Sequence, residues 1–203
     1  IQSMEGVELI DKDEEQDSGS KKNSMQEFVR ERLESHGVDD TDIQILLEKS
    51  PKKWTLYPPL LLINNQNTFE SSEWTNLFLG REINRDRFFA DLLSSCFGPS
   101  ITSIAVNKPI IEHDVMRRPF SLTPIYGNFG PEPTSSMLDA PTEEDFSNAF
   151  WCTVTQNGIH QTWAPRYTMF SRGNIKEKKR ILDSFTDVKN NCVVDLYAGI
   201  GYF

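Results

Sequence analysis

Apolar residues in the first half of the chain recur at helical spacing. The first predicted helix begins at Ser24, which has the spacing of a capping box with Glu27, and ends at Gly37. Its apolar positions are Met25, Phe28, Val29 and Leu33. Three further helices are predicted over residues 41–49, 74–78 and 88–93.

Continuous or alternating apolar runs predict strands between and after these helices. Residues 54–63 are apolar but are interrupted by Pro58-Pro59, which favours an edge strand or an extended crossing. Residues 101–106 predict a second strand. Asn157-Gly158 is the preferred pair for a two-residue type I′ turn, and alternation on both sides predicts a hairpin over residues 150–163.

Composition divides the chain into four parts. Residues 1–23 are acidic and then rich in Ser and Lys, with too little apolar content to offset chain entropy, so we expect a disordered or loosely held arm. Residues 24–125 are predicted to form an α+β domain, and residues 126–149, rich in Pro, Gly and acids, an exposed loop. Residues 150–203 should begin another domain. Because the chain starts with Ile and stops just after a glycine turn, we expect it to be a fragment.

The formal net charge of −9 is unevenly distributed. Residues 1–17 hold seven acids and one base, whereas residues 151–203 hold seven bases and four acids. A negative total argues against a polyanionic partner, but the distribution of charge matters more than its sum. The basic end of the chain is therefore the end where such a partner is expected.

A membrane span, a disulfide framework and a metal site are not indicated. No apolar run approaches the roughly 18 residues that a span needs, and no secretory signal is present, so we expect a cytoplasmic protein without a membrane partner. Cys96, Cys152 and Cys192 are widely spaced in apolar sequence and are predicted to be buried thiols. In a strand, Glu112-His113-Asp114 would alternate between faces, so no metal is predicted there. The oligomeric state is left open.

The end of the chain has the pattern of a nucleotide-binding turn. Residues 191–197 predict a short buried strand that contains Asp195 and leads into Gly199-Ile200-Gly201. A strand followed by Gly-x-Gly opens many doubly wound domains, because glycine lets backbone amides approach a ligand closely. A tight turn in an ordinary sheet fits these residues equally well.

A basic segment precedes this strand. Asn174 and Glu177 have the spacing of N-cap and N3 residues and predict a helix that begins at Ile175. Residues 178–180 (Lys-Lys-Arg) would lie in its early turns, where cations oppose the helix dipole. This placement suggests a role other than helix stability, and a solvated helix face is the alternative.

Two stretches together resemble a known signature. Residues 169–178 (Met-Phe-Ser-Arg-Gly-Asn-Ile-Lys-Glu-Lys) and 194–203 (Val-Asp-Leu-Tyr-Ala-Gly-Ile-Gly-Tyr-Phe) are similar to the tRNA wybutosine-synthesising aminocarboxypropyltransferases and to their sister family, the tRNA guanine-N1 methyltransferases. The Met-Phe-Ser-x-Gly-Asn part favours the wybutosine branch. The hairpin fits the same family, and the resemblance covers residues 150–203.

This resemblance implies a fold and an activity. The fold would be an α/β class I S-adenosylmethionine-dependent methyltransferase-like (Rossmann-like) domain, present here only as far as its first strand. The activity would be transfer of the 3-amino-3-carboxypropyl group from S-adenosyl-L-methionine to 4-demethylwyosine, beside the anticodon of tRNA-Phe. The alternatives are guanine-N1 methylation or, for this fragment alone, a noncatalytic tRNA- or protein-binding module. Catalytic groups would lie beyond Phe203, so the fragment itself is expected to be inactive.

The resemblance also implies binding residues. Ser171 and Lys178 would contact the cofactor, with Lys178 suited to its carboxylate, and Asp195 with the Gly199 and Gly201 turn would line its methionine end. Arg166 is a lesser candidate, for the cofactor or for RNA phosphate. Basic residues that could contact phosphates are Arg117, Arg118, Arg166, Arg172 and those among residues 176–180.

Overall fold

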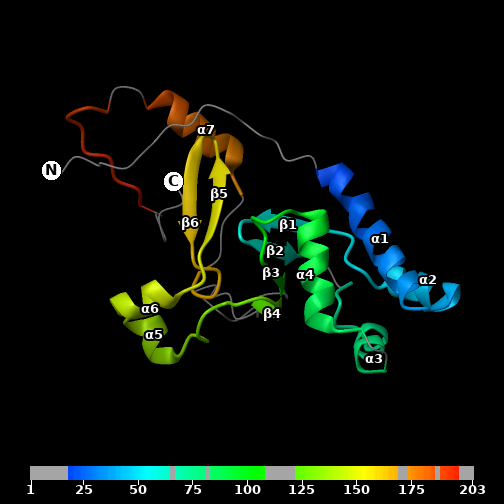
Figure 1. Ribbon diagram of the computed structural model, residues 1–203. Helices are drawn as coiled ribbons and strands as arrows, with labels where there is room; N and C mark the ends of the chain where they lie inside the picture. Colours follow the sequence, from blue (N-terminus) through cyan, green and yellow to red (C-terminus); the bar gives the residue numbers. More distant parts are fainter. Residues whose placement is uncertain are drawn as a thin grey trace.

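The computed structural model describes residues 18–64, 67–80, 83–107, 122–168, 173–185 and 188–196. In chain order the elements are α1 (Ser18–Ser35), α2 (Asp40–Glu48), β1 (Trp54–Tyr57), β2 (Leu60–Ile63), α3 (Ser72–Gly80), α4 (Arg85–Cys96), β3 (Ser103–Asn107), β4 (Leu122–Tyr126), α5 (Ser135–Asp139), α6 (Glu143–Asn148), β5 (Cys152–Gln156), β6 (Ile159–Trp163) and α7 (Ile175–Ser184). Figure 1 shows a helical half, a small sheet and a separate hairpin.

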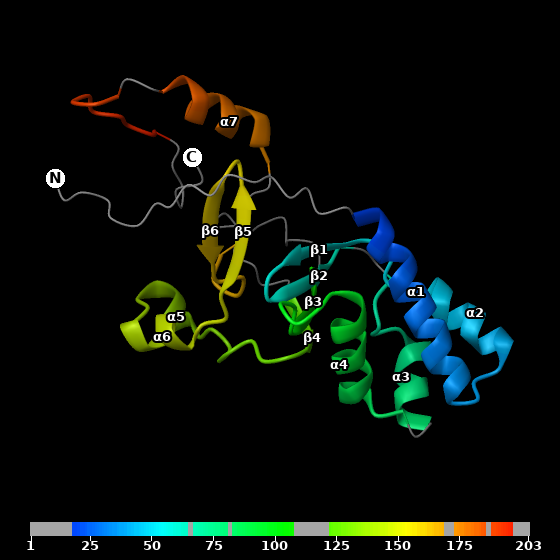
Figure 2. The same ribbon diagram turned by 45° about the horizontal axis from the view of Figure 1, so that its top comes forward.

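The sheet has the order β1-β2-β3-β4. Its outer pairs are antiparallel, and the central pair, β2 with β3, is parallel. A parallel pair needs a crossover connection. Here α3 and α4 provide it, and Figures 1 and 2 show that α1 to α4 all lie on the same side of the sheet.

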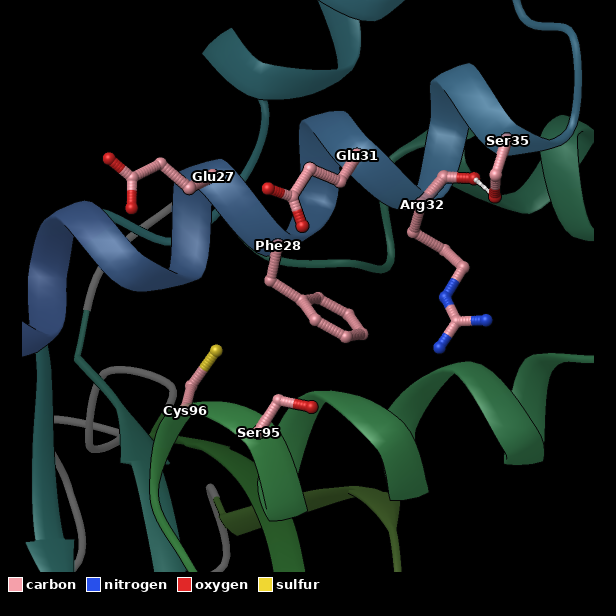
Figure 3. A pocket seen from close by; sticks show the side chains of 7 residues that line it. All are labelled: Glu27, Phe28, Glu31, Arg32, Ser35, Ser95 and Cys96. Atoms are coloured by element: carbon pink, nitrogen blue, oxygen red, sulfur yellow. Dashed lines mark hydrogen bonds between the residues drawn. The ribbon is translucent and has the colours of Figure 1, made fainter.

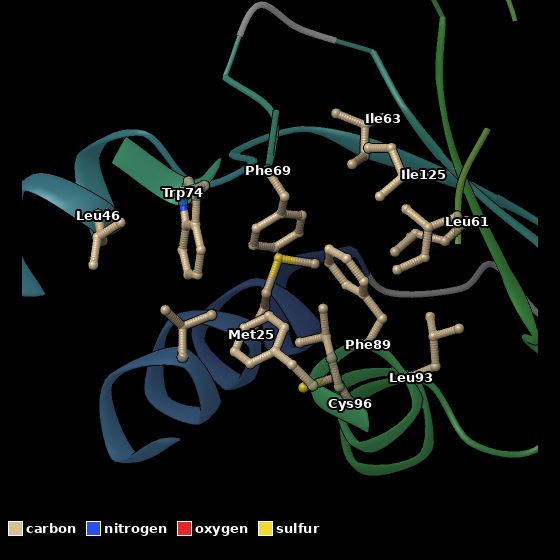
Figure 4. Packing of buried hydrophobic residues seen from close by; sticks show 14 of the residues in the cluster. Met25, Leu46, Leu61, Ile63, Phe69, Trp74, Phe89, Leu93, Cys96 and Ile125 are labelled. Atoms are coloured by element: carbon tan, nitrogen blue, oxygen red, sulfur yellow. The ribbon is translucent and has the colours of Figure 1, made fainter. Parts of the chain in front are cut away.

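The main core lies between these helices and the sheet (Figure 4). Met25, Val29 and Leu33, one stripe of α1, are completely buried. An aromatic cluster fills the centre, where the ring centroid of Phe69 lies 5.0 Å from that of Trp74 and 5.3 Å from that of Phe89. Burial of such large rings dominates core energetics.

A second apolar cluster occupies the other face of the sheet. Side chains of a strand alternate between faces, so neighbouring positions of β2 belong to different clusters. The members of the second cluster are Tyr57, Leu60, Ala105, Phe129, Cys152 and Trp163. The rings of Tyr57 and Trp163 meet edge to face with centroids 4.9 Å apart, and the Thr153 amide donates to the Pro58 carbonyl at 2.9 Å. The base of the hairpin is thereby attached to the sheet.

Two predicted elements of the first half differ from the structure. Helix α1 begins at Ser18, upstream of the predicted Ser24–Glu27 cap, so part of the predicted arm is helical and residues 1–17 lie outside the described residues. Residues 54–63, predicted to be an edge strand or an extended crossing, form two paired strands, because Pro58-Pro59 forms the turn between β1 and β2. Neither proline then has to donate an amide hydrogen inside the sheet.

The predicted loop over residues 126–149 contains the last residue of β4 and two short helices. Helix α6 has a capping box, in which the Thr142 hydroxyl accepts from the Asp145 amide at 3.2 Å and the Asp145 carboxylate accepts from the Thr142 amide at 2.8 Å. Hydrogen bonds from Thr142 lower the pKa of the Asp145 carboxyl. Thr-x-x-Asp is a variant of the capping-box pattern, so the sequence did contain a signal for this helix.

None of the helices in the described ranges is both long and apolar enough to cross a membrane.

Candidate functional site

The structure describes three of the six residues predicted to bind the cofactor. Arg166, Lys178 and Asp195 are described, whereas Ser171 and the two glycines, Gly199 and Gly201, lie outside the described residues. Among the described residues no group of three or more His, Cys, Asp or Glu side chains could hold a metal ion. Glu112-His113-Asp114 also lies outside them.

The β5–β6 hairpin forms where the turn residues predict it. Asn157 has φ 54° and Gly158 has φ 77°, the two positive values that a type I′ turn requires. Gln156 pairs with Ile159 next to the turn. The prediction of the hairpin is confirmed, and its turn end lies beside α7 in Figures 1 and 2.

Helix α7 begins at Ile175 with Asn174 at its N-cap, as predicted, but the predicted capping hydrogen bonds do not form. Asn174 has left-handed backbone angles and its side chain makes no capping hydrogen bond, because a side-chain cap needs an extended N-cap residue. Glu177 instead accepts from Arg180 at 2.6 and 2.9 Å. This interaction lowers the pKa of the Glu177 carboxyl.

Two hydrogen bonds join the hairpin to the first turn of α7. The ammonium Nζ of Lys178 donates to Oε1 of Gln156 at 3.3 Å. The side-chain Nδ2 of Asn157 donates to the carbonyl of Ile175, also at 3.3 Å. Lys178 is partly buried, and desolvation lowers the pKa of its ammonium. The two sequence features that fit one family, the hairpin and residues 174–178, are thus in physical contact.

The guanidinium of Arg166 is engaged by backbone carbonyls. Its Nη1 donates to Gly130 at 3.1 Å and to Pro131 at 3.3 Å, and Nη2 lies 4.0 Å from the carboxylate of Glu132. The side chain is only 15% exposed. Arg166 therefore links the chain after β6 to the segment after β4, and this arrangement favours a structural role over contact with a cofactor or phosphate.

Residues 191–196 form no strand in the structure, so the predicted strand is wrong for them. Val193 is 61% exposed and Val194 is 68% exposed. A strand of this composition gains its stability from pairing with neighbours and from burial of both faces, and the described part of the chain pairs no strand with it. Asp195 lies in this exposed segment, as does Cys192.

The cysteine prediction holds for two of the three thiols. Cys96 and Cys152 are buried, whereas Cys192 is exposed because the segment around it is exposed. Burial raises the pKa of the Cys152 thiol to about 12. Such a thiol is chemically inert at neutral pH.

The basic side chains of α7 differ in whether they form ion pairs. Lys179 pairs with Asp183 at 3.3 Å, and Arg180 pairs with Glu177. Lys176 is exposed and forms no ion pair with any residue of the described ranges. The predicted phosphate-contacting residues Arg117, Arg118 and Arg172 lie outside those ranges.

A hollow in the described part of the chain lies away from the hairpin and α7, on the helical side of the sheet (Figure 1). It has a volume of about 470 Å³ and lies between α1 and α4 (Figure 3). Its lining residues are Glu27, Phe28, Glu31, Arg32, Ser35, Ser95 and Cys96. None of the predicted site residues lines it. The hollow combines two acids with an arginine that already pairs with Asp91, so its charge does not point to one kind of ligand.

Sequence reasoning did not identify Gln156 as a site residue. A glutamine next to a hairpin turn is ordinary, and its partner Lys178 is 22 positions later in the chain. Only the docking of α7 on the hairpin brings the two side chains together. No local pattern could have indicated this contact.

Comparison with known proteins finds relatives that match most of the chain. The chain is 40% identical over 205 residues to tRNA wybutosine-synthesizing protein 2 of Saccharomyces cerevisiae, which covers 89% of the chain and 44% of the relative. It is 47% identical over 156 residues to the protein of the same name in Schizosaccharomyces pombe, covering 75% of the chain and 35% of the relative. A homolog in Macaca fascicularis is 28% identical over 153 residues. No protein-family model and no solved structure matches the chain.

The chain spans less than half the length of these curated relatives.

Proposed function

Because this chain belongs to the family of tRNA wybutosine-synthesizing protein 2, we propose that the protein takes part in wybutosine modification of tRNA. The proposed reaction is transfer of the 3-amino-3-carboxypropyl group of S-adenosyl-L-methionine to 4-demethylwyosine in tRNA-Phe; the bond from this group to the sulfonium breaks, and 5′-methylthioadenosine leaves. The observation that carries the proposal is the 40% identity to the Saccharomyces cerevisiae relative over 89% of the chain. Cytoplasmic location stays a prediction.

The described residues fit the cosubstrate in charge but do not enclose it. The methionine end of S-adenosylmethionine carries a carboxylate, which suits the ammonium of Lys178, and an ammonium, which suits the carboxylate of Asp195. Ser171, Gly199 and Gly201 would complete this end and lie outside the described residues. When bound, the molecule would supply a sulfonium whose attached carbons are open to attack by a nucleophile.

In this proposal the residues of this chain position charged groups against the cosubstrate and the tRNA. Contact with Gln156 and burial against the hairpin restrict where the Lys178 ammonium can lie. Exposed cations of α7, Lys176 foremost, would meet phosphates of the tRNA and supply affinity without reading its sequence. Selectivity for one sulfonium carbon would come from holding that carbon in line with the attacking base atom.

The test uses the protein at the length of its relatives and tRNA from cells that lack the modification. Two preparations of S-adenosylmethionine carry label either in the methyl group or in the carboxyl group. The proposed reaction moves the carboxyl label into tRNA and leaves the methyl label in solution. Lys178→Met should weaken binding of the labelled cosubstrate, whereas Lys179→Met, a neighbouring cation on the same helix, should not.

Other outcomes decide between the alternatives. Entry of the methyl label into tRNA would refute the proposal in favour of a guanine methyltransferase. Binding of tRNA with no cosubstrate binding by calorimetry would favour a noncatalytic module.

A further inference from the structure

Two adjacent residues of the hairpin hold one face of α7. Gln156 is the last residue of β5 and Asn157 the first residue of the turn, and each bonds to the first turn of the helix, at Lys178 and Ile175. Residues three apart in a helix lie on the same face, so the two bonds act on one side of α7. The left-handed conformation of Asn157 fixes the turn from which both side chains extend.

Among the described residues of the hairpin and α7, the charged groups near Lys178 are few, and most of them are paired with each other. The hairpin strands carry no Asp, Glu, Lys or Arg, and their one histidine, His160, is hydrogen-bonded to Thr155 at 2.9 Å. On α7 itself, Glu177 is engaged with Arg180, and Asp183 with Lys179. The flanking cation Lys176 completes the set of charged groups on this part of the helix. The neutral amide of Gln156 is thus one acceptor of the Lys178 ammonium, and it comes from the hairpin.

We propose that Gln156 is a positioning residue, which holds the Lys178 ammonium by its amide oxygen and presents it to the carboxylate of the cosubstrate. This inference rests on the proposed function. An ammonium has three N–H donors, so a bond to Gln156 is compatible with a further bond to a carboxylate. A neutral acceptor orients the ammonium without cancelling its charge, which a glutamate in the same place would do.

The first experiment measures Lys178 alone and uses the 203-residue chain. Acylation of the Lys178 amine is followed against pH by peptide mass spectrometry in the parent and in Gln156→Leu, Gln156→Glu and Gln161→Leu. Loss of the acceptor disfavours the ammonium, so the pKa of Lys178 should fall and its acylation should quicken in Gln156→Leu. In Gln156→Glu the pKa should rise and acylation should slow.

Gln161→Leu is the matched control. Gln161 lies on β6 of the same hairpin, and its Oε1 accepts no hydrogen bond from the residues that the structure describes. In Gln161→Leu the rate of Lys178 acylation should depend on pH as it does in the parent. An unchanged profile in both Gln156 variants, or an equal change in Gln161→Leu, would overturn the proposal.

The second experiment measures binding in the protein at the length of its relatives. Dissociation constants are compared for S-adenosylmethionine and for its decarboxylated analogue, which lacks the carboxylate. Gln156→Leu should weaken S-adenosylmethionine binding by about threefold to tenfold, the effect of losing one partly screened bond to a charged group. Gln156→Leu should leave binding of the decarboxylated analogue unchanged, because the analogue has no carboxylate for the Lys178 ammonium to contact.

The two experiments separate the failure of this inference from failure of the proposed function. Equal weakening of both ligands would mean that Gln156 only supports the local fold, and would refute its positioning role. If the parent protein binds neither ligand, the proposed function fails, while the lysine profiles still decide whether Gln156 holds the ammonium.

Discussion

Replacing Arg166 with methionine tests whether this arginine supports the fold or binds a ligand. The guanidinium donates to the carbonyls of Gly130 and Pro131 at 3.1 and 3.3 Å, and its side chain is 15% exposed. Methionine keeps much of the side-chain volume and removes the donors. Both carbonyls would then lose the partner that joins the segment after β4 to the segment after β6.

The expected loss of stability follows from these two bonds. A hydrogen bond from a charged donor contributes about 1.5–3 kcal/mol, and the length of both bonds favours the low end of that range. The Glu132 carboxylate, 4.0 Å away and 89% exposed, adds little because exposed ion pairs are screened. We expect the free energy of unfolding to fall by about 2–3 kcal/mol, which lowers the urea midpoint by about 1–1.5 M at an m value of about 2 kcal/mol/M.

The assay is urea denaturation followed by circular dichroism, with tRNA binding measured on the same samples. Lys179→Met is the control, since it also replaces a cation by methionine but breaks only an exposed ion pair with Asp183. Its midpoint should stay within the error of the measurement. Unchanged stability of Arg166→Met together with weaker tRNA binding would refute the structural role and restore the arginine as a ligand residue.

Three further predictions concern a glycine, a thiol and a lysine. A Cβ at Gly130, which has φ 67°, would overlap the Asn148 carbonyl oxygen, so Gly130→Ala should lower the free energy of unfolding by at least about 1–3 kcal/mol in urea melts, whereas Gly80→Ala, with open space around it, should not. The pKa of the Cys152 thiol is raised from 9.0 to about 12, so stability should fall as pH rises through this window, because the unfolded chain loses the proton first, and Cys152→Ala should reduce that fall. An equally steep fall in the variant would contradict the burial argument. Lys176→Ala should weaken tRNA binding and reduce the slope of log affinity against log salt by about one, as expected for one lost phosphate contact, and an unchanged slope would exclude that contact.

Elements with local turn or capping chemistry could be predicted from the sequence. The hairpin follows from Asn157-Gly158, because those two residues readily adopt the positive φ values of a type I′ turn. The start of α7 and the N-cap position of Asn174 also follow from the sequence, but a side-chain cap does not form, since the left-handed Asn174 cannot present its side chain to the helix. In the sequence Pro58-Pro59 predicts only an interruption of an apolar run, because composition does not reveal that the residues on its two sides pair with each other.

Features that depend on contacts distant in the sequence could not be predicted. The engagement of Arg166 joins residues 36 positions apart, and the Gln156–Lys178 bond joins residues 22 apart. The apolar pattern of residues 191–196 indicates a strand, yet a strand needs neighbours, and the described residues provide none. The sequence therefore predicts the charged residues of the candidate site, and only the fold shows which residues, such as Gln156, hold those side chains in position.

The edge-to-face contact of Tyr57 with Trp163 has a consequence for reading genetic data. This contact belongs to an apolar cluster to which both the four-stranded sheet and the hairpin contribute, and the hairpin in turn supports α7. Damage to the sheet should therefore also disturb the basic helix α7. A substitution that weakens tRNA binding can therefore lie in the N-terminal half and act by disturbing the packing of the sheet and the hairpin. The free energy of unfolding of such a variant should be measured before its position is assigned to the tRNA-binding site.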